Sequence, residues 1–299
     1  MKKLYSVLVV AILASLVLAA CGAGATKADN LLDAIKQRGY IVVSTDPNYA
    51  PQSSLNTEGK RPSATKCPSD ALTTAEMQGF DVDVAKAIGD DLGVETCFAT
   101  PSWDAITAGN WANKWDVSVG SMTIKPARQK VLDFSVPYYY TPAVVAVKAD
   151  STFKSLDDLA GQALCVGSAT TYEDWLNGKL DIRPEDIYAK PPANVTVVSL
   201  ETDQECAQAI TAGRQDFVGY VTSGTVVDQN IAAGMPVKKL GEPVFSENLA
   251  ASFDKSSSLP TDSLRAEVDK LFTAMHSDGR LADLSNKWFK ADLTVAPNG

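Results

Sequence analysis

The sequence predicts an α/β protein with parallel-rich sheets flanked by helices. Apolar runs of strand length alternate along the chain with amphipathic helical segments, a pattern typical of parallel sheets. The chain has 299 residues, of which 45% are apolar and 21% charged, and this composition is that of a folded protein rather than a disordered one. The length allows for about two domains, because single cores stop growing near ~250–300 residues.

The elements follow one another from residue 30 onward. In the first half we expect a helix over 30–38 that ends at Gly39, a strand over 40–44, a helix over 80–92 that ends at Gly93, a strand over 94–99, a short helix capped by Ser102, and a strand over 115–121. In the second half, Thr202 and Glu205 form a capping-box signature for a helix that ends at Gly213. A strand over 216–221 and a long helix over 261–276 follow, whereas 52–76 reads as a long surface loop.

Charge and residue usage exclude several functions. The formal net charge is −9, which argues against a nucleic-acid partner because phosphate recognition needs a basic face. The chain holds one histidine, His276, and no Cys-x-x-Cys pair, which removes most metal sites and histidine-based catalysis. We therefore expect no catalytic residue, no metal and no cofactor.

Residues 1–20 have the pattern of an export signal. Lys2 and Lys3 precede an apolar stretch over 4–18 that is too short to span a membrane. The ending Leu18-Ala-Ala-Cys21 resembles the bacterial lipobox, which predicts lipidation of Cys21 and an extracytoplasmic protein anchored to a bacterial membrane, in the periplasm or on the cell surface. The alternative is an unmodified cysteine inside the signal peptide.

Several motifs in order resemble one protein family. They are Gly79-Phe-Asp-Val-Asp83, then Asp116 to Arg128 with the string Val-Ser-Val-Gly-Ser-Met-Thr123, then Asp133-Phe-Ser-Val-Pro-Tyr138, and Lys287-Trp-Phe289 near the end. Together they are similar to the family 3 extracellular solute-binding proteins, over about residues 29–289. The resemblance implies the binding component of an ABC importer for polar amino acids, with two lobes that close on the ligand.

The same resemblance implies the domain organisation. We expect a two-lobe, periplasmic-binding-protein-like fold of type II, with lobe 1 over 29–143 and 245–295, lobe 2 over 144–244, and crossing strands near 140–148 and 244–253. Four cysteines remain after Cys21, and they allow three pairings. In an oxidising compartment disulfides are the default, although four free thiols are the alternative. The division into lobes favours the pairs Cys67–Cys97 and Cys165–Cys206.

The resemblance assigns lobe 1 residues to a ligand site. Arg128 follows a strand end, and its planar fork suits a ligand carboxylate, although an isolated arginine would more often form a surface ion pair. Gly120, Ser121 and Thr123 lie at the same strand end and would add neutral hydrogen bonds. Asp46, Tyr49 and Trp103 are further candidates, for a cationic group and for apolar cover. Their alternatives are a turn cap at Pro47 for Asp46 and a core position for Trp103.

Lobe 2 contributes a strand-to-helix link and one departure from the family. Ala169, Thr170 and Thr171 lie where a helix start would bind the same carboxylate, or where Thr170 would simply cap the helix. The family places an acidic partner for the α-ammonium where this chain has Val221, beside Thr222, which offers only a hydroxyl. An unpaired buried ammonium is costly, so the departure leaves open whether the ligand carries an α-amine.

The expected function is ligand capture for an importer. The expected partners are a small ligand, an ABC permease and a membrane contacted through the lipid anchor, and the protein is expected to be a monomer. Two alternatives stay open: an exported enzyme on the same fold, similar to cyclohexadienyl dehydratases, and a ligand-sensing input domain.

Overall fold

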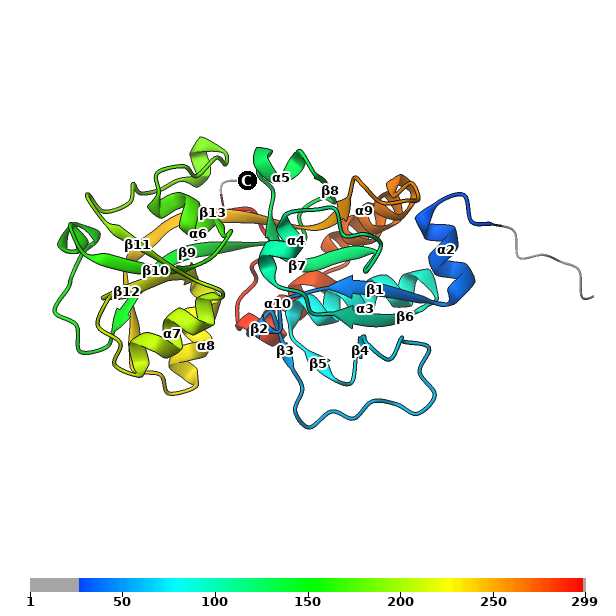
Figure 1. Ribbon diagram of the computed structural model, residues 1–299, viewed down its shortest axis with the longest axis horizontal. Coiled ribbons are helices and arrows are strands. Elements are labelled where there is room, and N and C mark those ends of the chain that lie inside the picture. The colour runs from blue at the N-terminus through cyan, green and yellow to red at the C-terminus, as the bar shows by residue number, and fades with distance from the viewer. Residues whose placement is uncertain (1–26, 298–299) are drawn as a thin grey trace, which may run out of the picture.

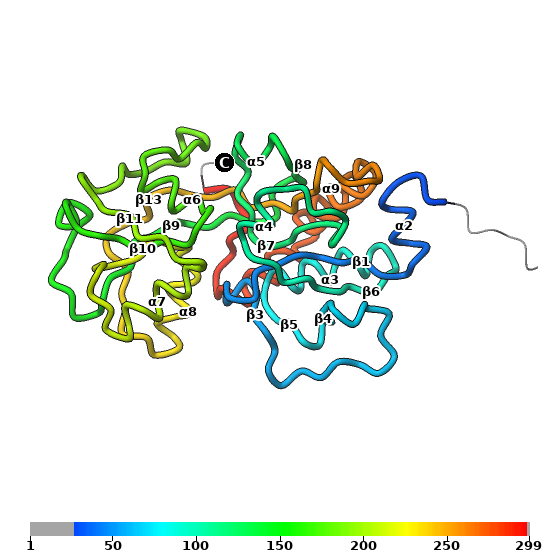
Figure 2. Tube along the Cα trace, viewed as in Figure 1, coloured from blue at the N-terminus to red at the C-terminus, as the bar shows by residue number. Residues whose placement is uncertain are grey.

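The computed structural model describes residues 27–297, so the predicted signal peptide and Cys21 lie outside the described residues. Two lobes lie side by side along the long axis of the molecule (Figure 1). The chain builds most of the first lobe, passes into the second, and returns to the first with its last helices, as the colour change along the trace shows (Figure 2).

The helices and strands alternate largely as the sequence predicts. The helices are α2 (Leu31–Arg38), α3 (Phe80–Leu92), α4 (Trp103–Thr107), α5 (Pro126–Gln129), α6 (Thr171–Leu176), α7 (Asp203–Thr211), α8 (Gly224–Ala232), α9 (Asp262–Ser277) and α10 (Arg280–Phe289). The strands are β1 (Tyr40–Ser44), β2 (Asn48–Tyr49), β3 (Ser53–Leu55), β4 (Leu72–Thr73), β5 (Met77–Gln78), β6 (Glu95–Ala99), β7 (Val117–Thr123), β8 (Leu132–Phe134), β9 (Tyr139–Lys148), β10 (Ala163–Gly167), β11 (Thr196–Leu200), β12 (Gly219–Ser223) and β13 (Val237–Asp254).

One sheet runs through both lobes in the order β11-β10-β12-β9-β13-β7-β1-β6-β4, with β8 paired to β13. The pairs β1/β6 and β1/β7 in one lobe and β10/β11 and β10/β12 in the other are parallel. Their carboxyl ends therefore supply the loops that carry ligand sites in open α/β sheets. The α/β class and the two-lobe fold are confirmed.

The long strands β9 and β13 connect the lobes. They pair antiparallel from Val237↔Lys148 to Leu249↔Tyr139, with a register shift between Leu240 and Phe245. Each strand thus belongs to both lobes, and the interruption of the ladder lies among residues of the second lobe's core. Two adjacent connections of this kind permit hinge bending with little disruption of either core.

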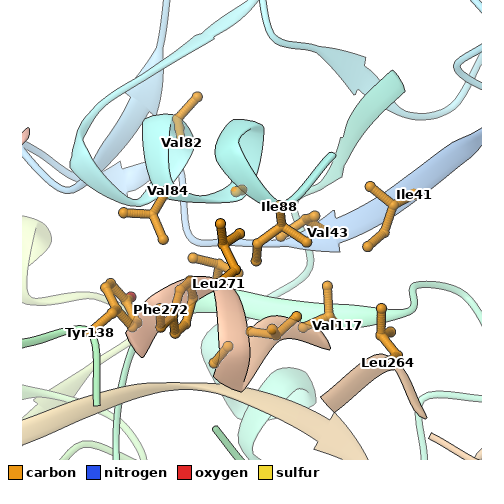
Figure 3. Packing of buried hydrophobic residues seen from close by; sticks show 14 of the residues in the cluster. Ile41, Val43, Val82, Val84, Ile88, Val117, Tyr138, Leu264, Leu271 and Phe272 are labelled. Atoms are coloured by element: carbon orange, nitrogen blue, oxygen red, sulfur yellow. The ribbon is translucent and has the colours of Figure 1, made fainter. Parts of the chain in front are cut away.

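Each lobe has its own hydrophobic core. In the first lobe, Val84 and Ile88 of α3 lie against Leu271 and Phe272 of α9, with Val117 of β7 beside them (Figure 3). In the second lobe a separate cluster gathers side chains of β9, β10, α6 and β13, namely Val145, Leu164, Val166, Trp175 and Phe245. Because α9 comes from the end of the chain, the first lobe is completed only after the second has been built.

Local signals position these elements. Asn30 caps α2 by accepting from the N–H of Asp33, and Gly39 ends that helix with φ +80°, a conformation that costs glycine little. The capping box of Thr202 and Glu205 opens α7 as predicted. Helix α7 ends earlier than expected, at Thr211, with Gly213 two residues beyond.

Two disulfides form the predicted pairs, Cys67–Cys97 and Cys165–Cys206, with Cα–Cα separations of 5.5 and 5.7 Å. The segment 52–76 is not a plain surface loop, because it contains β3 and β4, and Gln52 and Ser53 are buried. Across residues 27–297 no helix is long and apolar enough to cross a membrane. The same residues hold no cluster of histidine, cysteine or acidic side chains suited to a metal ion.

Candidate functional site

A cavity lies between the lobes at the ends of the central strands. It has about 470 Å³ of space between protein atoms, part of it open to solvent. Its lining comes from both lobes and from the crossing strand β13: Asp46, Tyr49, Trp103, Gly120, Ser121, Thr123, Arg128, Gly167, Thr170, Thr171, Tyr172, Glu201, Thr202, Asp203 and Glu247.

Arg128 is the cation in this lining, and it is almost completely buried, with 4% of its surface exposed. Its Nη1 donates to the carbonyl of Thr123 at 3.1 Å, and its Nη2 donates to the carbonyl of Ala169 at 3.0 Å. Its Nε has no partner. Burial lowers the pKa of Arg128 to about 10, partly offset by Glu247 and Asp174, so the group remains charged at neutral pH.

Trp103 fixes the plane of this guanidinium. The ring lies 5.3 Å from the Arg128 Cζ, a cation–π distance. The indole Nε1 is buried and has no hydrogen-bond partner. Trp103 therefore acts as a wall of the cavity and a support for Arg128, and it also packs against the neighbouring core cluster of lobe 1.

Glu247, on β13, is a buried carboxylate that contacts both lobes. Thr123 Oγ1 donates to its Oε1 at 2.6 Å from the first lobe. The hydroxyl of Thr171 donates to the same oxygen, and the Tyr172 hydroxyl donates to Oε2 at 2.7 Å, both from the second lobe. The Tyr172 hydroxyl also lies 2.9 Å from the Tyr49 hydroxyl across the cleft.

Asp203 is a second buried carboxylate, at the first position of α7. Its Oδ1 accepts from the N–H of Gly167 at 2.7 Å, and its Oδ2 accepts from Thr222 Oγ1 at 2.8 Å. Burial raises the pKa of Asp203 to about 7, and the nearby charges of Glu247 and Asp46 act in the same direction. A cation placed beside it would stabilise the ionised form.

Asp46 closes the turn at Pro47 and also lines the cavity. Its Oδ1 accepts from the backbone N–H of Asn48 at 2.8 Å. Burial raises the pKa of Asp46, against the opposing effect of the Asn48 hydrogen bonds. Tyr49, beyond the same turn, lines the cavity beside it.

Ser121 lines the cavity, but its polar groups are engaged within lobe 1. Its N–H donates to the Tyr138 hydroxyl at 3.0 Å, and its Oγ donates to Asp81 Oδ2 at 2.6 Å. Its φ of +56° is uncommon outside glycine. Ala169, across the cleft, has a similar φ of +57°, so each lobe holds one such residue at the cleft, as is frequent at binding sites.

Thr170 caps α6. Its Oγ1 accepts from the N–H of Glu173 at 3.1 Å and donates to the carbonyl of Gly167 at 2.7 Å. With six residues, α6 has a weak dipole, and the Thr171 hydroxyl is used by Glu247. The capping interpretation therefore accounts for Thr170, and the geometry adds little to an anion site at this helix start.

Most of the residues selected from the sequence meet in the cavity. The structure places Asp46, Tyr49, Trp103, Gly120, Ser121, Thr123, Arg128, Thr170 and Thr171 in its lining. Ala169 and Thr222 do not line it, because the carbonyl of Ala169 holds Arg128 and the hydroxyl of Thr222 holds Asp203. Sequence reasoning missed Gly167, Tyr172, Glu201, Thr202, Asp203 and Glu247 as lining residues. The capping box at Thr202 was the available signal for three of these, since it marks a helix start that follows a strand end.

A cavity between two lobes joined by crossing strands, with a buried guanidinium and buried carboxylates facing it, defines a protein that binds a small polar solute. The family model of the bacterial extracellular solute-binding proteins, family 3, matches residues 41–291, and the chain belongs to this family.

Individual relatives agree with this assignment. The chain is 29% identical over 271 residues to L-cystine-binding protein TcyJ of Escherichia coli (strain K12), covering 89% of this chain and 88% of that protein. It is 28% identical over 233 residues to ABC transporter arginine-binding protein 1 of the same strain, covering 76% and 88%. The crystal structure of an ancestral amino acid-binding protein, described as a precursor of cyclohexadienyl dehydratase, matches with a TM-score of 0.68 and 28% identity over 86% of this chain and 99% of that one. The protein is thus a solute-binding protein of the amino-acid ABC transport class.

Proposed function

We propose that this protein captures a polar amino acid or a related small carboxylate in the interlobe cavity and carries it to an ABC permease. Arg128 binds the ligand carboxylate, with Trp103 holding the guanidinium in place and Thr123 beside it. The neutral lining residues Tyr49, Gly120 and Ser121 shape the cavity around the ligand. Closure of the lobes about β9 and β13 removes the ligand from water, which strengthens each charged contact.

The observation that carries this proposal is the unpaired charge of Arg128. Among residues 27–297, no carboxylate lies within ion-pair distance of its guanidinium, although it is buried. The group has five N–H donors, two of which meet carbonyls. A buried charge with free donors is costly unless an anion arrives, and a carboxylate matches the remaining fork geometry.

A thermal-shift screen of the purified, oxidised protein tests the proposal. The panel holds the amino acids, their decarboxylated and deaminated analogues, and small dicarboxylates. A ligand that binds only the native state raises the melting temperature by mass action, so we expect shifts with compounds that carry an α-carboxylate. Shifts with decarboxylated analogues equal to those with the parent amino acids would contradict it.

The cellular setting is part of the proposal. The lipobox-like ending at Cys21 supports a lipid anchor that keeps a monomeric protein on the outer side of a bacterial membrane, next to its permease. The two separate cores support the division into lobes, with one crossing between Tyr139 and Ala143 and the other between Phe245 and Leu249, a few residues from the predicted boundaries at 143/144 and 244/245. Mass spectrometry of the mature protein tests the anchor, since lipidation adds a glyceryl group with two acyl chains, in thioether linkage, to an N-terminal Cys21.

An exported enzyme is the second candidate, and one observation favours it. Asp203 faces the cavity with a pKa raised to about 7, which suits a group that exchanges protons near neutral pH. We favour binding without turnover, so the ligand should be recovered intact after prolonged incubation with the protein. A new product detected by mass spectrometry, and absent with Asp203→Asn, would favour the enzyme.

A further inference from the structure

The cavity lining carries more negative charge than positive charge. Arg128 is opposed by four carboxylates: Asp46, Glu201, Asp203 and Glu247. No lysine or arginine among residues 27–297 forms an ion pair with any of the four. Lys125, the nearby cation beside Arg128 in sequence, is paired with Asp174. Asp203 and Glu247 are buried, whereas Asp46 is half-buried and Glu201 is exposed. A ligand with one carboxylate and one ammonium would leave one of the two buried carboxylates without a cation.

Glu247 is the carboxylate that shares a partner with Arg128. Thr123 joins the two, because its carbonyl accepts from Arg128 at 3.1 Å and its hydroxyl donates to Glu247 at 2.6 Å. The α-carboxylate and α-ammonium of an amino acid are attached to the same carbon. A ligand held by Arg128 through its carboxylate therefore presents its α-ammonium near Glu247.

Asp203 is held at a different place, within the second lobe. A Cβ added to Gly167 would lie 2.5 Å from Asp203 Oδ1, so glycine is required for the close approach of that strand end to the carboxylate. Gly167 and Thr222 each donate one hydrogen bond to Asp203. The carboxylate is thus oriented by two donors from separate strands and lies at the wall of the cavity with 5% of its surface exposed.

Val221 cannot take part in cation binding. Its side chain is fully buried in the core of the second lobe, next to Thr222, which points its hydroxyl to Asp203. The chain therefore lacks a carboxylate on β12 itself and instead has two carboxylates on neighbouring elements, α7 and β13.

We propose, on the basis of the function proposed above, that Glu247 and Asp203 form two separate cation subsites, Glu247 for the α-ammonium and Asp203 for a cationic group on the ligand side chain. The preferred ligand is then a basic amino acid. A doubly zwitterionic ligand such as cystine fits less well, because its distal carboxylate would meet Asp203 and the lining offers no second cation. An amino acid with a neutral side chain would leave Asp203 uncompensated.

Calorimetric titration with matched ligand pairs tests this inference. Arginine is compared with citrulline, its uncharged isostere, and lysine with norleucine, with cystine as a further ligand, all at pH 8. We expect the unmodified protein to prefer the cationic member by about 10- to 100-fold, the range of one charged hydrogen bond or more. Asp203→Asn is expected to bring the arginine-to-citrulline ratio close to one. Glu247→Gln is expected to weaken both ligands together, because both carry an α-ammonium.

The outcomes of this titration distinguish failure of the cation subsites from failure of the proposed function. Asp216→Asn, an exposed change of the same charge in the same lobe, should leave the ratio as it is. If amino acids bind but citrulline or cystine binds as tightly as arginine and lysine, the cation subsite is wrong and the proposed function stands. If Asp203→Asn weakens arginine and citrulline equally, Asp203 is only structural and the assignment fails. If no amino acid binds, this inference fails, and if the deaminated and dicarboxylate compounds of the thermal-shift panel also fail to bind, the proposed function falls with it.

Discussion

At the scale of single residues, the cleft is built from buried charges that are hydrogen-bonded but not ion-paired. Arg128 donates to two carbonyls, Asp203 accepts from a backbone N–H and a hydroxyl, and Glu247 accepts from three hydroxyls. Neutral donors and acceptors orient a charge without forming an ion pair with it, so the charge stays available to a ligand. The site is therefore prepared for a charged ligand at the expense of the stability of the empty protein.

The pKa of Asp203 predicts how affinity depends on pH. The group faces Thr222, Gly167, Glu247 and Asp46, and its pKa of about 7 means that it is increasingly protonated below that pH. A cationic side chain binds the ionised form, so the dissociation constant for a basic amino acid should rise about tenfold from pH 8 to pH 6. Calorimetry at both pH values measures this.

Asp81 is a second buried carboxyl group that titrates near neutral pH, so the pH dependence of affinity needs a control. Burial also raises its pKa to about 7, and it accepts hydrogen bonds from Ser121 and Tyr138 behind the cavity wall. Asp203→Asn keeps Asp81 and should abolish most of the pH dependence. An undiminished pH dependence in that variant would point to Asp81 instead.

At the scale of elements, the second disulfide supports the ligand site. Cys165 lies on β10 two residues before Gly167, and Cys206 lies on α7 three residues after Asp203. The bridge therefore ties together the two elements that meet in the hydrogen bond between Gly167 and Asp203. Removing it should loosen both the fold and this contact.

We expect the double change Cys165→Ala/Cys206→Ala to lower the free energy of unfolding by about 2–4 kcal/mol and to reduce the preference for arginine over citrulline. Denaturant unfolding and calorimetry measure the two effects. Cys67→Ala/Cys97→Ala is the matched control, since that bridge lies in the first lobe and its cysteines do not line the cavity. If Cys67→Ala/Cys97→Ala lost as much of the preference for arginine over citrulline as Cys165→Ala/Cys206→Ala, the second disulfide would have no local role at the ligand site.

At the scale of the whole molecule, closure is held by contacts between the lobes that do not need the ligand. Gln52 Nε2 donates to Thr225 Oγ1 at 2.6 Å, and Lys125 forms an ion pair with Asp174. The Lys125 side chain is 10% exposed and that of Asp174 31%, so their pair is screened less than one at an open surface. These contacts favour the closed arrangement.

Lys125→Met should shift the protein toward an open arrangement and weaken ligand binding by about three- to tenfold, mainly through faster dissociation. Small-angle scattering should then give a larger radius of gyration without ligand and the unmodified value with saturating ligand. Lys86→Met, which removes an ion pair with Asp90 inside one helix, is the control. If the two changes had equal effects on affinity and on the radius of gyration, the loss of one positive charge, and not the opening of the lobes, would be the cause.

The fold was predictable because its signals are local. The glycines that end α2 and α3 and the capping box that opens α7 each depend on a few neighbouring residues. All three signals appear in the structure. The cavity residues of the first lobe were predictable for a similar reason, since Thr123 and Arg128 follow one strand within a single motif.

The remaining cavity residues could not be predicted because their positions depend on pairing between distant segments. Asp203 reads as the first residue of a capped helix, and only the meeting of α7 with Gly167 and Thr222 turns it toward the cavity. Glu247 lies on a crossing strand, whose register with β9 brings it between the lobes. Thr222, selected for its hydroxyl, holds Asp203 and does not face the cavity itself.

The central claim is that Arg128 binds the carboxylate of an amino acid. The most direct test is calorimetric titration of Arg128→Met with the amino acid that binds most tightly, beside Arg214→Met, which removes an exposed arginine from the second lobe. We predict a loss of affinity of about 100-fold or more for Arg128→Met, corresponding to two charged hydrogen bonds, and no measurable change for Arg214→Met. Unchanged affinity in a folded Arg128→Met protein would contradict the account.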